Sequence, residues 1–81
     1  MTDLQLQLLN DNVHTVLTAD GEHVGNLKRI GAVWKFKAIG YDAGGEVVPG
    51  GGPLTDRHNL VVATPTADAL NAAMRAVPPL G

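Results

Sequence analysis

The chain has 81 residues, a formal net charge of −2 and no cysteine. This length allows one domain, whose core hides about 60 to 65% of the surface of the unfolded chain, and without cysteine neither disulfides nor thiolate metal sites can add stability. No window approaches the roughly 20 apolar residues of a membrane span, and the amino terminus lacks the basic and apolar regions of a secretory signal. We therefore expect one cytoplasmic domain over residues 1–81, in a bacterial setting, with no membrane partner.

Strand patterns dominate the first part of the chain. Leucine alternates with glutamine over residues 4–8, which is typical of a half-buried strand. A second strand is predicted over 13–19 and a third over 23–30. Between them, Asp20-Gly21 predicts a two-residue hairpin turn, because both central positions of that turn need a positive φ, which Asp and Gly tolerate.

Gly31-Ala32 predicts a second hairpin, with glycine at the first central position of the turn. The turn would pair the residues on either side of it and so set the register of both strands. In that register Leu27 faces Phe36 on the side of the sheet that we expect to be the core. Lysines and asparagine occupy the opposite side.

The remainder of the chain predicts a short edge strand over 46–48, a Gly/Pro-rich loop over 49–59 and another short strand over 60–63. A helix should follow, with Thr64 as its N-cap and Pro65 at its first position.

The predicted helix is one-sided, since Leu70 and Met74 share a face. At about 13 residues it would be marginal alone, so we expect that face to dock against Trp34 and Phe36, with Val77 continuing the stripe.

These elements predict an α+β fold: a twisted antiparallel sheet of four to five strands with one C-terminal helix packed on one face. The single domain would comprise a sheet over 4–48, a loop over 49–59, and a short strand and helix over 60–77.

The sharpest candidate site lies on the side of the sheet away from the core. Lys28 faces Lys35 there, and two lysines directly opposite each other repel. A polyanion across this face would relieve the repulsion, although lysine also keeps exposed strands solvated and resistant to aggregation. The predicted nucleic-acid-binding residues are Asn26, Lys28, Lys35 and Lys37.

The same side also carries several β-branched residues. A domain this small is not expected to leave so many apolar side chains exposed to water. Either the amino-terminal strand or a second copy of the protein would cover them. The predicted interface residues are Val24, Ile30, Val33 and Ile39.

Enzymatic and metal sites are not expected. The loop over 50–59 lacks the Lys-Ser or Lys-Thr step of a phosphate-binding loop, so we expect a connection, with small-ligand binding as a minor hypothesis. The histidines lack metal-ligand spacing. The chain has no serine or cysteine nucleophile and no paired carboxylates. No catalytic residue, metal or cofactor is predicted.

The order of elements over residues 24–77 is that of a strand ending at Ile30, a Trp-bearing strand over 33–38, a turn, a short strand and a Thr-capped helix. This order resembles the three-stranded-sheet DNA-binding domains of phage and transposon integrases and of plant ethylene-response regulators. The resemblance implies that the exposed sheet face lies in the major groove with the helix behind it. Lysines in place of arginines would imply little sequence selectivity.

The sequence therefore predicts a small non-enzymatic interaction module that self-associates or binds another protein. The alternative is a nucleic-acid-binding module that uses the lysine-bearing sheet face.

Overall fold

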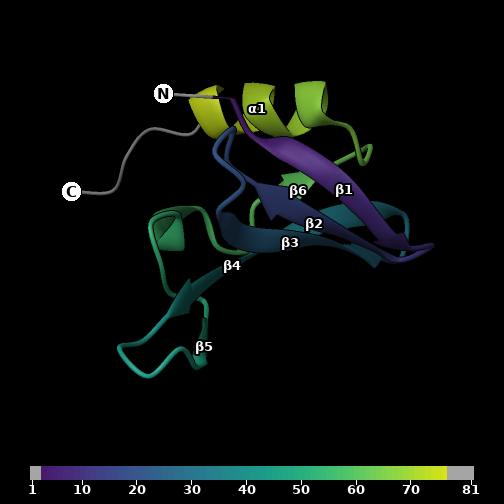
Figure 1. The fold of residues 1–81 in the computed structure, drawn as a ribbon. Coiled ribbons are helices and arrows are strands. Elements are labelled where there is room, and N and C mark those ends of the chain that lie inside the picture. Colours follow the sequence, from purple (N-terminus) through teal and green to yellow (C-terminus); the bar gives the residue numbers. More distant parts are fainter. Residues whose placement is uncertain (1–2, 77–81) are drawn as a thin grey trace.

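One antiparallel sheet and one helix make up the α+β fold, as the sequence predicts (Figure 1). The computed structural model describes residues 3–76. The sheet has the order β1-β2-β3-β4-β5, and β6 also pairs with β4. The elements are β1 (Gln5–Asn10), β2 (Val13–Leu17), β3 (His23–Ile30), β4 (Val33–Tyr41), β5 (Val47–Pro49), the 3-10 turn η1 (Thr55–Arg57), β6 (Val61–Val62) and α1 (Ala67–Ala76).

The β3–β4 hairpin has the predicted turn and register. Gly31 adopts a φ of 62°, which glycine tolerates at the first central position of a tight turn. Ile30 pairs with Val33 across the turn, and the pairing continues without a shift to Gly25 and Ala38. The hairpin therefore places Lys28 opposite Lys35, as predicted.

The β2–β3 turn differs from the prediction. Thr18 N–H donates to Glu22 O at 2.9 Å, and Gly21 N–H donates to Thr18 O at 2.9 Å, so the loop has one residue more than expected. Gly21 has a φ of 88°, whereas Asp20 has no positive φ. A three-residue hairpin loop needs only one residue in the left-handed conformation, whereas the two-residue turn needs two. Gly21 by itself meets that requirement. β2 consequently ends at Leu17.

A β-bulge follows this turn and corrects the prediction for Val24. Leu17 pairs with His23 and Val16 pairs with Gly25, which leaves Val24 as the extra residue. A bulge shifts the alternation of side chains by one position. Val24 is therefore 1% exposed within the core instead of lying on the lysine side of the sheet.

The core lies between the sheet and α1, as predicted. Leu70 and Met74 of α1 belong to the same buried cluster as Leu27 and Phe36, and Trp34 packs against it. The ring of Phe36 covers Gly25 on the core side of β3. A Cβ placed there would lie 2.5 Å from the Phe36 ring, so that ring fills the space above the glycine.

β6 is shorter than predicted, β5 keeps its predicted length but is shifted by one residue, and α1 begins later than predicted. β5, β6 and α1 each lie within one to three residues of the expected bounds. The N-cap of α1 is Thr66 instead of Thr64: its hydroxyl accepts from Ala69 N–H at 3.1 Å, and its carbonyl accepts from Leu70 N–H at 3.0 Å. The prediction for Val77 lies outside the described residues.

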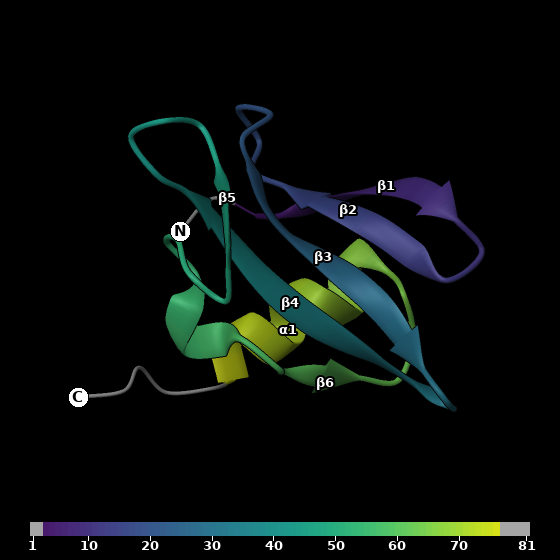
Figure 2. The ribbon, with the colours of Figure 1, turned by 90° about the horizontal axis from the view of Figure 1, so that it is seen from below.

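The outer edge of β4 is closed along its length. β6 covers its start and β5 its end, and Figure 2 shows both beside β4, with α1 behind the sheet. The segment between β5 and β6 completes the edge through hydrogen bonds from Gly50 N–H to Ala38 O (2.8 Å), Ala38 N–H to His58 Nδ1 (3.0 Å), Asn59 N–H to Phe36 O (2.7 Å) and Phe36 N–H to Leu60 O (2.7 Å).

Candidate functional site

The strongest candidate site is the sheet face opposite α1, which we call the lysine face and define by Asn26, Lys28, Lys35 and Lys37. The register pairs Asn26 with Lys37 and Lys28 with Lys35 on the side away from the core. Lys28 is exposed, and the other three residues are half-buried. The structure therefore brings all four predicted residues together. They lie on β3 and β4, which are neighbouring strands in Figure 2.

The lysine face carries cations without matching acids. None of the eight acids of the chain lies in a strand; all lie in turns, loops, the amino terminus or α1. Among residues 3–76 the ion pairs are Arg57–Asp56 and Arg75–Asp3, neither of which involves a lysine. Lys37 Nζ instead donates to Asn59 Oδ1. Repulsion between Lys28 and Lys35 is thus not offset by a neighbouring carboxylate.

A polar cluster that the sequence did not predict borders this face. His23 Nε2 lies 3.0 Å from Asn26 Oδ1, and His23 Nδ1 lies 3.2 Å from Tyr41 Oη. Residues three apart in a regular strand point to opposite faces, but the bulge at Val24 brings His23 and Asn26 to the same side. The cluster fixes Asn26 beside Lys37, so the amide is oriented within the sheet.

The predicted interface residues do not form one surface. Val24 and Ile39 are 1% and 7% exposed, so the chain itself buries them. Ile39 pairs with Pro49, and the backbone of Gly52 lies against its carbonyl. Ile30 is 48% exposed and Val33 is half-buried, so these two remain on the lysine face.

Polar groups of the glycine loop over 50–59 form hydrogen bonds within the chain. Besides the bonds to β4, Gly51 N–H donates to Val48 O at 3.1 Å and Thr55 Oγ1 donates to Gly50 O at 2.6 Å. Arg57 pairs with Asp56 and donates to Met74 O at 3.4 Å. The loop thus acts as a cover for the edge of β4, and its geometry gives little support to the small-ligand hypothesis.

A cavity of about 340 Å³ opens away from the lysine face, between the β2–β3 turn and the glycine loop. Leu4, Val24 and Leu54 line it together with Asp20 and Glu22. Within residues 3–76, no group of His, Asp and Glu side chains could hold a metal ion.

Protein-family models, curated proteins and solved structures gave no significant match to this chain. None of the helices in the described part of the chain is long and apolar enough to cross a membrane.

Proposed function

We propose that this protein is a small non-enzymatic interaction module whose lysine face binds an extended polyanion, with nucleic acid as the ligand class. The carrying observation is the direct pairing of Lys28 with Lys35 on a face whose strands contain no acid. Like charges opposite each other destabilise a sheet. Phosphates lying between them would turn that repulsion into attraction.

The architecture supports this proposal beyond the charges. α1 packs on one side of the sheet and leaves the other side to present Asn26 and the lysines, as in the sheet-type DNA-binding domains that the sequence resembles. Lysine binds phosphate as a point charge and lacks the fork with which arginine recognises guanine. The expected binding is thus modest in affinity and nearly indifferent to base sequence.

Self-association is the second candidate function, favoured by apolar side chains beside the lysines. Ile30 and Val61 are 48% and 49% exposed. A face-to-face dimer, however, would bring the lysines of one copy against those of the other, with no acid on either face. Charge therefore favours a polyanion on this face and directs self-association to another surface.

The test is a backbone-amide chemical-shift titration with mixed-sequence DNA at low and at physiological salt. Neutralising about three phosphates predicts a slope of log K against log salt near −2.7 on duplex DNA. Lys35→Gln should reduce its magnitude by about 1. The matched control is Arg75→Gln, which removes one cation from α1, and it should leave the slope unchanged.

Shifts that centre on Asn26 to Lys37 would support the proposal. The proposal would be contradicted if Lys35→Gln and Arg75→Gln reduced the salt slope of DNA binding equally, or if the affinity for DNA did not depend on salt.

A further inference from the structure

Among residues 3–76, β1 forms a sheet edge that lacks the usual protection. Natural proteins discourage edge-to-edge pairing with charged residues, prolines, bulges or covering segments. The outer edge of β4 has such a cover, but β1 runs Gln-Leu-Gln-Leu-Leu-Asn, without a charge or a proline. Leu8 and Leu9 are 67% and 65% exposed. A bulge between Leu8 and Asn10 leaves the part from Gln5 to Leu8 regular.

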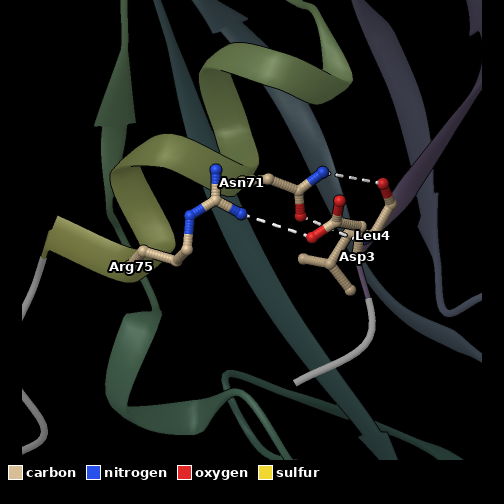
Figure 3. A network of polar contacts seen from close by, with 4 residues as sticks. All are labelled: Asp3, Leu4, Asn71 and Arg75. Atoms are coloured by element: carbon tan, nitrogen blue, oxygen red, sulfur yellow. Dashed lines mark hydrogen bonds and ion pairs between the residues drawn. The ribbon is translucent and has the colours of Figure 1, made fainter.

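Asn71 shows which backbone groups of this edge face outward. Its Oδ1 accepts from Leu4 N–H at 2.8 Å, and its Nδ2 donates to Leu4 O at 3.0 Å (Figure 3). The backbone of Leu4 thus points away from β2. Because alternate residues of a strand point their N–H and C=O groups the same way, those of Leu6 and Leu8 also point outward. Asn71 occupies the place of a neighbouring strand at Leu4 and leaves the other two positions to a partner.

We propose that a second copy of the chain adds its own β1 to this edge, antiparallel and about a two-fold axis at Gln7. In this register Leu6 of each copy faces Leu8 of the other, and each such pair exchanges both of its main-chain hydrogen bonds. The register uses the backbone groups that Asn71 leaves uncovered. The leucines of both copies meet on the α1 side of the sheet, and Gln7 meets Gln7 on the lysine side.

A second copy fits this edge better than other occupants do. The outward groups of Leu6 and Leu8 are symmetric about Gln7, so the edge is complementary to itself. The strands bring no charge against a like charge, since β1 is uncharged. The opposite edge of the sheet consists of β5, which has three residues and ends at Pro49, and β6, which has two. Such short edge strands discourage head-to-tail addition and favour a closed dimer.

The proposed dimer would also enlarge the basic surface. A two-fold axis perpendicular to the sheet keeps both helices on one side and both lysine faces on the other. With strands about 4.8 Å apart, the two lysine groups would lie roughly 30 Å from each other. The dimer does not depend on the proposed polyanion binding, and either could hold without the other.

A cysteine cross-link tests the register directly, because the chain has no native cysteine. Gln7→Cys places two thiols at a non-hydrogen-bonded pair on the axis, where Cα atoms lie about 4.5 Å apart, within disulfide range. Gln5→Cys is the matched control, since its two copies would lie about 13 Å apart. We expect mild oxidation to give a disulfide dimer of Gln7→Cys only. Equal cross-linking of both variants would overturn the register.

Oligomeric state gives the second arm of the test. The interface is small, so we expect dissociation near 100 µM, to order of magnitude, measured by diffusion NMR from about 10 µM to 1 mM. Leu8→Lys should give a monomer, whereas Val47→Lys, a comparable change on the opposite edge of the sheet, should leave the dimer intact. A wild-type monomer at 1 mM, or a dimer that survives Leu8→Lys, would overturn the proposal. DNA titration of the monomeric Leu8→Lys variant separates this result from the proposed function.

Discussion

Gly25 controls the packing of the core at the scale of single residues. It lies on the core side of β3, and the ring of Phe36 lies over it so closely that a Cβ would approach ring carbons to 2.5 Å and the Lys37 carbonyl oxygen to 2.8 Å. Phe36 is fully buried among leucines and valines and has little room to move. The glycine is therefore required by space, since its φ is not positive.

Gly25→Ala should destabilise the fold by about 2 kcal/mol, because the added methyl group must displace Phe36 or the β4 backbone. Urea denaturation followed by Trp34 fluorescence measures the change. Gly44→Ala is the control: its Cβ would lie 3.4 Å from Asp42 Oδ1, in ordinary contact, and its φ is not positive. A loss of stability no larger than that of the control would show that the core adapts to the methyl group.

His58 completes the edge of β4 in a way that the sequence alone did not predict. Its Nδ1 accepts the hydrogen bond from Ala38 N–H, so the neutral ring carries its hydrogen on Nε2. The His58 side chain thus accepts the hydrogen bond that a backbone carbonyl of a neighbouring strand would otherwise accept. The role depends on the glycine loop turning back along β4, which brings residues 20 positions apart into contact, and no local pattern around His58 indicates it.

At the scale of elements, Asn71 joins the carboxyl-terminal helix to the first strand. The helical pattern predicted the buried face of Leu70 and Met74 but not a polar residue between them. Asn71 is 8% exposed and bonds to both main-chain groups of Leu4. Beside it, Arg75 pairs with Asp3 at 3.3 Å on the surface (Figure 3). Both contacts hold the amino terminus against α1.

Asn71→Ala should cost about 1 to 3 kcal/mol of unfolding free energy, since it leaves the N–H and C=O of Leu4 without their partner. Arg75→Ala removes only an exposed ion pair and should change stability by less than about 1 kcal/mol. Hydrogen exchange adds a local measure: the Leu4 amide should lose protection in the first variant and keep it in the second. Equal effects would show that the surface pair holds the terminus.

The two hairpins differ in how far their local sequence determines the turn and the register. Gly31 specified its turn, and the alternation on both sides carried the register to Gly25. In the other hairpin, Asp20-Gly21 fitted two turn lengths, and the backbone adopted the one with a single positive φ. The bulge that follows cannot be deduced from alternation, because it is a break in it. For that reason the prediction placed Val24 on the wrong side of the sheet and missed the contact between His23 and Asn26.

At the scale of the whole molecule, the distribution of charge runs against the net charge. The protein is acidic overall, yet its strands carry lysines and no acids. One sheet face is thereby cationic, while the acids lie in the turns and loops, at Asp3 and on α1 behind the sheet. Lys28 and Lys35 repel each other on this face, and an acid at either position would remove the repulsion. A destabilising pair of this kind is expected where binding and stability compete.

Lys35→Glu separates these two requirements. An opposite charge facing Lys28 should replace the repulsion with an attraction and raise the free energy of unfolding by about 0.5 kcal/mol. The same substitution should weaken DNA binding, because it removes one phosphate contact and adds a repelling charge. Lys35→Gln should lie between wild type and Lys35→Glu in both measurements. Thermal unfolding and the DNA titration, carried out on the same three proteins, would then change in opposite directions. If stability rises while binding stays constant, the lysines serve to keep the face solvated, and a polyanion is not its ligand.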